Sequence, residues 1–94
     1  MAMIPDAKIT DVAVIFEGEI YSLPAPNRHH NVIHMMYGNG IRINGPSLEG
    51  FLDENGTFLN RSAGMIRAQR NGQLNRREGD QFYQGPDLYS EDLW

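Results

Sequence analysis

The feature that most constrains the fold is a β-hairpin signal near the start of the chain. Residues 9–16 (Ile-Thr-Asp-Val-Ala-Val-Ile-Phe) are rich in β-branched side chains and partly alternate between apolar and polar. The dipeptide Glu17-Gly18 follows, and a tight hairpin turn needs the positive φ that glycine adopts without steric cost. Residues 19–23 then supply the returning strand. The sequence therefore predicts a hairpin over residues 9–23.

A second hairpin is expected around Asn55-Gly56, because apolar and aromatic residues lie on both sides of this strong turn signal. It is predicted to cover residues 51–59. The preceding segment 38–50 is rich in glycine and is expected to be a loop, with room for a short strand at 41–43. The loop contains neither of the glycine-rich patterns that cradle nucleotide phosphates, which argues against a P-loop.

Two helices are predicted, over residues 27–37 and 60–71. Each is preceded by asparagine, a favourable N-cap residue, and each is followed by glycine, which favours the left-handed conformation at a helix end. In the second helix Ala63 and Ile66 are expected to face inward, with Met65 as a further candidate, and Gly64 indicates either close packing or a weak helix. The residues expected to begin and end the helices are Asn27 and Gly38, and Asn60 and Gly72.

The length of 94 residues allows one small domain with a thin core. The expected fold class is α+β: a small antiparallel sheet, formed by the N-terminal hairpin and its neighbours, packed with two α-helices. Residues 85–94 are acidic but include Leu88, Tyr89 and Trp94, so this tail is expected to dock on the domain. Nothing resembles a secretion signal or a membrane span, which favours a soluble, cytosolic protein.

Most catalytic chemistry is disfavoured by the residues present. The chain has no cysteine, hence no disulfide, thiolate nucleophile or cysteine-based metal site. His30 and His34 have zinc-like spacing, but the sequence fixes no third ligand, so no metal or other cofactor is expected. A polar helix surface, or a capping role for His29, is expected instead. No serine lies in a nucleophile elbow, and adjacent carboxylates such as Asp53 and Glu54 are typical of solvated surface. An enzyme is therefore not expected.

The net charge of −4 conceals a segregated pattern. Residues 57–77 contain five arginines and no acidic residue, whereas residues 78–94 contain five acidic residues and no basic one. Seven of the eight basic residues are arginine, whose planar fork suits phosphate recognition better than a lysine ammonium does. The arginines either pair with the acidic segment, within or between subunits, or bind an anion. Both alternatives remain open at this point.

The candidate binding residues lie at the starts of the two helices. Arg28 is followed by His29 and His30 in the first turn of one helix, and Asn60-Arg61 begins the other. Free backbone N–H groups at a helix N-terminus favour an anion. With Phe51 or Phe58 as a stacking surface, such a site could hold a phosphorylated, aromatic ligand. Alternatively, the asparagines only cap the helices and the arginines pair with the acidic tail.

Several sequence blocks resemble a family of small phage proteins, the Thoeris anti-defence sponges. These blocks include Arg28-His-His, the segment 50–61 and the end of the chain, Ser90-Glu-Asp-Leu-Trp94. The resemblance implies a homo-oligomer, dimer or hexamer, in the cytoplasm of the infected bacterium. It further implies capture of a host immune signal, a cyclic ADP-ribose isomer or, as in some members of that family, a cyclic oligonucleotide, without cleavage. Neither a membrane nor long nucleic acid is an expected partner.

The resemblance also implies roles for particular residues. Arg28 would meet phosphate or ribose, Phe51 would line the pocket or stack, and Asn60 and Arg61 would read polar groups. Arg76 or Arg77 would reach a phosphate from a neighbouring subunit. The segment Ser62-Ala63-Gly64 departs from the family pattern, which puts the packing of this helix in question. Two alternative functions remain open. The first is direct inhibition of a host complex through the arginine-rich surface, and the second is nucleotide hydrolysis that uses Asp53.

Overall fold

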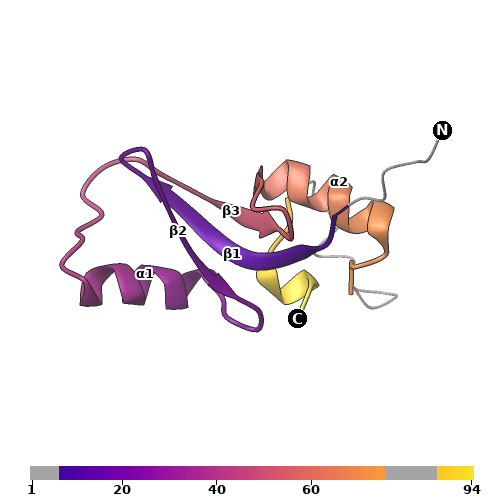
Figure 1. The fold of residues 1–94 in the computed structure, drawn as a ribbon, viewed down its shortest axis with the longest axis horizontal. Helices are drawn as coiled ribbons and strands as arrows, with labels where there is room; N and C mark the ends of the chain where they lie inside the picture. The colour runs from indigo at the N-terminus through magenta and orange to yellow at the C-terminus, as the bar shows by residue number, and fades with distance from the viewer. Residues whose placement is uncertain (1–6, 76–86) are drawn as a thin grey trace.

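The computed structural model describes residues 7–75 and 87–94 and has the expected α+β architecture, with a four-stranded antiparallel sheet and two α-helices (Figure 1). No helix in these two ranges is long and apolar enough to span a membrane. The elements are β1 (Ile9–Phe16), β2 (Glu19–Pro24), α1 (His29–Gly38), β3 (Ser47–Asp53), β4 (Phe58–Asn60), α2 (Arg61–Asn71) and the short 3-10 helix η2 (Ser90–Asp92).

The strands lie in the order β2-β1-β3-β4, so the two hairpins are joined through β1 and β3 in the centre of the sheet. β1 pairs with β3 along almost its whole length, from Phe16 opposite Ser47 to Ile9 opposite Asp53. A register shift between Ile9 and Asp11 interrupts this ladder near its end. The pairing explains why β3 begins four residues before the predicted position at residue 51.

The first hairpin is confirmed. β1 and β2 are joined by a two-residue turn in which Glu17 and Gly18 both have positive φ, 52° and 79°. This is the conformation that fits the twist of a two-residue hairpin. Val12, Val14 and Phe16, which alternate along β1, are all buried, although Ala13 between them is buried as well.

The start and end of α1 differ from the prediction. Its N-cap is Arg28 rather than Asn27, whose side-chain amide donates instead to the Pro24 carbonyl at 2.7 Å. The Asn31 side chain accepts from the Arg28 backbone N–H at 2.8 Å and takes over the stabilising role at this end. At the other end Gly38 is still helical, and the left-handed glycine is Gly40, with φ of 81°.

The second hairpin is confirmed, with β3 and β4 joined around Asn55-Gly56. The Asp53 carboxylate accepts from the backbone N–H groups of Asn55 and Thr57, both at 2.9 Å, which shapes the turn. The predicted short strand at 41–43 does not form. Ile41 and Ile43 instead pack, partly buried, against the hydrophobic core from within the loop.

Helix α2 begins and ends as predicted. The Asn60 side chain accepts from the Ala63 backbone N–H at 2.8 Å, and Gly72 is left-handed with φ of 76°. The inward face agrees with the prediction at Met65, which is buried, but Ala68 is buried as well and Ile66 is 57% exposed. Gly64 marks close packing: a Cβ there would lie 3.1 Å from side-chain atoms of both Phe51 and Leu88.

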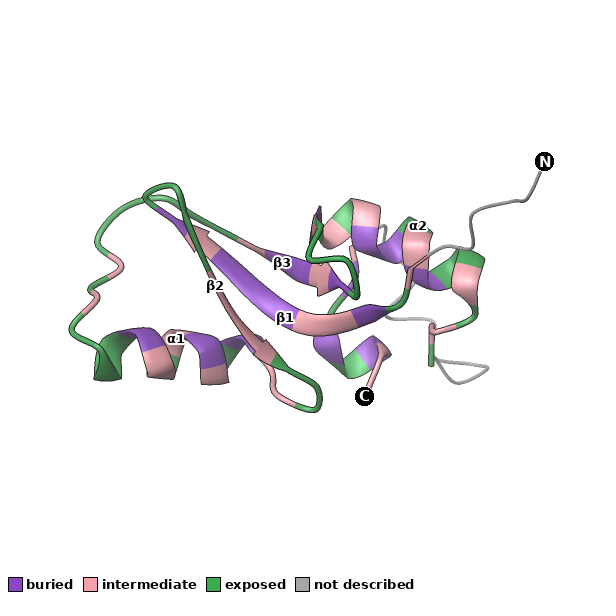
Figure 2. Ribbon diagram, in the orientation of Figure 1, coloured by how far each residue is buried: buried purple, intermediate pink, exposed green. Residues whose placement is uncertain are grey.

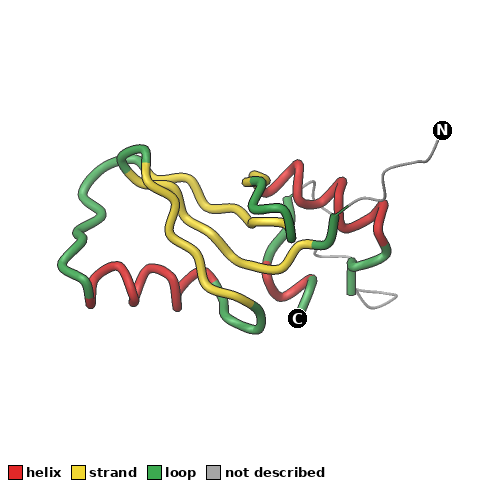
Figure 3. The backbone as a smooth tube through the Cα atoms, in the orientation of Figure 1, coloured by secondary structure: helices red, strands yellow, loops and turns green. Residues whose placement is uncertain are grey.

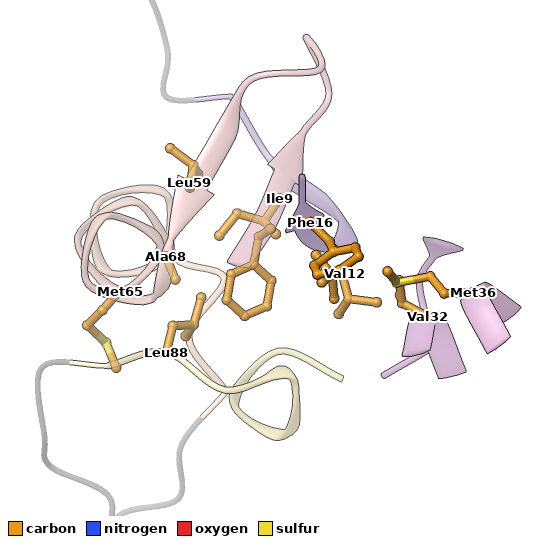
Figure 4. Packing of buried hydrophobic residues seen from close by; sticks show 11 residues of the cluster. Ile9, Val12, Phe16, Val32, Met36, Leu59, Met65, Ala68 and Leu88 are labelled. Atoms are coloured by element: carbon orange, nitrogen blue, oxygen red, sulfur yellow. The ribbon is translucent and has the colours of Figure 1, made fainter. Parts of the chain in front are cut away.

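The core lies between the sheet and the two helices. α1 packs on β1 and β2, and α2 packs on β3, β4 and β1. Figure 4 shows Val32 and Met36 of α1 close to Val12, with α2 and Leu88 on the other side of the cluster. Burial is concentrated along β1 and the inner faces of the helices, whereas the loop after α1 is largely exposed (Figure 2).

The expected docking of the tail is confirmed for residues 87–94; the rest of the predicted tail lies outside the described residues. Leu88 is completely buried in the core, and its backbone N–H donates to the Arg61 carbonyl at 2.9 Å. The Trp94 indole N–H donates to the Asn27 carbonyl at 2.8 Å. Residues 87–94, here called the C-terminal segment, thus bind next to the starts of both helices.

Candidate functional site

The structure brings the N-termini of the two helices to one place. In Figures 1 and 3, α1 and α2 run in opposite directions away from the middle of the molecule, and the turn formed by η2 lies between their starts. Arg28 at α1 and Arg61 at α2 both contact the C-terminal segment. The sequence pattern predicts one site formed by both helix starts, and in the structure these two starts lie close together.

Arg28 is surrounded by oxygen acceptors from the C-terminal segment. Its Nη1 donates to the Ser90 hydroxyl and to the Glu91 carboxylate, each at 3.2 Å, and its Nη2 donates to the Trp94 backbone oxygen. Its side chain nevertheless remains 34% exposed and that of Glu91 69% exposed. The guanidinium fork is therefore held in position and still reaches solvent.

Arg61 is held from three directions. Nη1 donates to the Leu88 carbonyl at 2.8 Å, and Nη2 forms a short ion pair with the Glu49 carboxylate on β3. The Tyr89 ring lies over the guanidinium, 4.6 Å from its carbon to the ring centre. The guanidinium is thus stacked on one aromatic ring and fixed in its plane by hydrogen bonds.

His29 connects the start of α1 to strand β3, which pairs with the residue that caps α2. Its Nε2 lies 2.7 Å from the Gly50 carbonyl, which can only accept, so this nitrogen carries the proton. Gly50 is in turn paired across the sheet with Asn60, the N-cap of α2. Burial lowers the pKa of the His29 imidazole, and the positive charge of Arg61 lowers it further, against the opposing effects of the hydrogen bond to Gly50 and the carboxylates of Glu49 and Glu91.

The aromatic surface of the site differs from the expectation. Phe51 is completely buried, and its ring forms an edge-to-face contact with His29 at 5.1 Å between ring centres. It therefore supports the site as a core residue and presents no face to a ligand. The exposed aromatic side chain next to the arginines is Tyr89, which is 44% exposed. Tyr89 lies in the segment predicted to dock as a tail, and no local motif distinguishes it as a site residue.

The remaining predicted residues are placed as follows. Asn60 uses its side chain to cap α2, and His30 is exposed in the first turn of α1. Arg76 and Arg77 lie outside the described residues. Among residues 7–75 and 87–94, no group of three or more histidines, aspartates and glutamates is arranged to hold a metal ion.

Two carboxylates that pair with arginines differ in how firmly they are held. Asp53 is 4% exposed and forms an ion pair with Arg67 at 2.8 Å. Burial raises the pKa of Asp53, but the hydrogen bonds from Arg67, Thr57 and Asn55 outweigh burial and lower it. Hydrogen bonding from Ser90 and the charge of Arg28 lower the pKa of Glu91, which stays largely exposed. The Arg67 pair is thus part of the interior, whereas the Arg28 pair lies at the surface.

Comparison with known proteins identifies a phage family. The model of the family described as phage T4 y16D protein matches residues 8–94, which is nearly the whole chain. Searches of curated proteins and of solved structures find no match. The expected small phage family is therefore confirmed at this coarser level. By this match the chain belongs to the phage T4 y16D protein family.

Proposed function

We propose that this phage protein binds a small anionic signalling nucleotide and holds it intact, acting as an anti-defence sponge in the cytoplasm of the infected bacterium. The observation that carries the proposal is the convergence of Arg28 and Arg61, from the starts of two helices, on one partly exposed surface. The Arg28 fork, whose side chain is 34% exposed, offers directional hydrogen bonds to phosphate oxygens, and Arg61 holds the Tyr89 ring beside it. Sequestration requires affinity and copy number, and no nucleophile or general base.

The acidic partner of Arg28 is compatible with this role. The Glu91 ion pair is long and exposed, and pairs of this kind contribute about 0–1 kcal/mol to stability. The pyrophosphate of such a nucleotide carries more charge and more acceptor oxygens than one carboxylate. A phosphorylated ligand could therefore take the place of Glu91 on Arg28 at little cost, while Ser90 and the Trp94 backbone oxygen keep the fork oriented.

The nucleotide proposal is preferred to direct inhibition of a host complex through an arginine-rich surface. That alternative needs the arginines of residues 57–77 to be available together. Arg61 pairs with Glu49, and Arg67 pairs with the buried Asp53, so two of the five are already neutralised within the chain. The third function, hydrolysis through Asp53, would need a carboxylate that can act as base, whereas Asp53 is buried in an ion pair.

The test is capture and release of cyclic ADP-ribose, the ligand class implied by the sponge resemblance. The protein is incubated with the nucleotide, free nucleotide is measured in the filtrate, and the protein is then denatured by heat. We expect the free nucleotide to be depleted before heating and recovered intact afterwards. Permanent loss would indicate an enzyme. No depletion, together with binding of host macromolecules that weakens steeply with salt, would favour the surface-interaction alternative.

A further inference from the structure

We infer that Tyr89 is the platform on which the base of the bound nucleotide stacks. This inference rests on the proposed function and adds to it a residue that recognises the base rather than the phosphate. The ring lies on the Arg61 guanidinium at 4.6 Å and is 44% exposed, so the guanidinium covers one face of the ring while a large part of the residue stays exposed to solvent. Stacking of a base on an aromatic side chain contributes roughly tenfold or more to affinity.

The backbone that carries the Tyr89 ring is held in place without a ligand. On one side of it Leu88 is completely buried, accepts from Arg61 Nη1 at 2.8 Å and donates its backbone N–H to the Arg61 carbonyl. The Tyr89 backbone itself donates to the Asp92 carboxylate at 3.0 Å and accepts from the Asp92 N–H at 2.9 Å. An exposed aromatic residue whose backbone is tied on both sides loses little conformational freedom on binding.

The position of Tyr89 joins a stacking surface to a phosphate-binding fork. The next residue in the chain, Ser90, accepts a hydrogen bond from Arg28, and Glu91 forms the ion pair with it. A ligand whose phosphate displaced Glu91 from Arg28 would therefore bring its sugar and base alongside Tyr89. Phe51 and Phe58 cannot serve in this way, because Phe51 is completely buried and Phe58 packs against Gly50.

The experiment compares cyclic ADP-ribose with ribose 5-phosphate, which carries a sugar phosphate and no base. We expect Tyr89→Ala and Tyr89→Leu to weaken cyclic ADP-ribose binding roughly tenfold and to leave the affinity for ribose 5-phosphate unchanged. Tyr89→Phe keeps the aromatic face and is expected to retain the wild-type affinity. The matched control is Tyr37→Ala, because Tyr37 is similarly exposed, at 49%, but lies near the far end of α1.

The outcomes separate this inference from the proposed function. If Tyr89→Ala and Tyr89→Leu bind cyclic ADP-ribose as tightly as wild type while Arg28→Ala loses binding, the site is correct and the platform is wrong. If both ligands lose affinity equally in the Tyr89 variants, the ring only supports the arginines, and the inference is overturned. If the wild-type protein binds no cyclic ADP-ribose, the proposed function fails and this inference fails with it.

Discussion

His29 shows how a single residue can serve both the fold and the site. It is 8% exposed, donates to the Gly50 carbonyl and touches Phe51, so it supports the position of the neighbouring Arg28. In the sequence it is one of three histidines within six residues, a pattern that predicts polar helix surface or a capping role for His29. Neither prediction is correct, because burial depends on a strand twenty-one residues away.

The His29 imidazole gives the protein a defined pH dependence. Because its pKa in the folded state is lowered from 6.5, the unfolded state binds more protons between the two values, and stability falls as the pH drops through this window. We expect the free energy of unfolding, measured in urea between pH 7.5 and 5, to decrease as the pH falls over this range. His29→Gln should remove this component, because glutamine does not titrate and its amide N–H can still donate to the Gly50 carbonyl.

The matched controls for this pH dependence are His30→Gln and His34→Gln, since both side chains are exposed on the same helix. Each control is expected to keep the wild-type dependence. The assignment to His29 would be contradicted if His29→Gln retained the decrease in stability below pH 6.5 or if either control abolished it.

At the scale of elements, the second hairpin depends on a close approach at Gly50. A Cβ there would lie 2.5 Å from the Phe58 ring and far inside van der Waals contact with the Leu59 backbone oxygen. A side chain can rotate away, but the strand backbone cannot move without breaking its pairing. Gly50→Ala is therefore expected to lower the free energy of unfolding by about 3 kcal/mol.

The control for Gly50→Ala is Gly45→Ala, because nothing lies within 4 Å of a Cβ at Gly45. We expect the control to change stability by no more than about 0.5 kcal/mol, as urea denaturation would measure. A Gly50→Ala protein as stable as the Gly45→Ala protein would mean that the β3–β4 pairing is not as tight as described.

Local signals in the sequence predict most elements, and long-range packing explains the differences. Both hairpin turns and the caps of α2 depend on residues adjacent in the chain, such as Glu17-Gly18, Asn60 and Gly72, and all are confirmed. The early start of β3 results from pairing with β1. The exposed position of Ile66 reflects the path of the C-terminal segment, which fills the core with Leu88 beside Gly64.

The candidate site was predictable in outline for the same reason. Arg28, Asn60 and Arg61 can be identified from helix-start signals, and the pairing of arginines with the acidic tail was one of the two alternatives considered. The roles of Phe51 and Tyr89 could not be assigned, because both are aromatic residues in apolar contexts and only the folded chain buries one ring and exposes the other. In the folded chain the two alternatives are not exclusive, since the Glu91 pair is weak enough to yield to a phosphate.

For the whole molecule, the claim to test is that the proposed nucleotide binding depends on Arg28. The measurement is the melting temperature with and without cyclic ADP-ribose for wild type, Arg28→Ala and Arg42→Ala. Arg42 is an exposed arginine in the loop after α1, so its replacement makes the same change in net charge. A ligand at about 100 times its Kd stabilises the folded state by about 2.7 kcal/mol, which corresponds to a rise of roughly 10 °C or more for a domain of this size.

We expect the nucleotide to raise the melting temperature of the wild-type and Arg42→Ala proteins equally and to leave that of Arg28→Ala unchanged. Arg28→Ala also loses contacts with the C-terminal segment, so each shift is measured against the same variant without ligand. A shift in Arg28→Ala equal to that of wild type, or no shift in the wild-type protein, would contradict the claim.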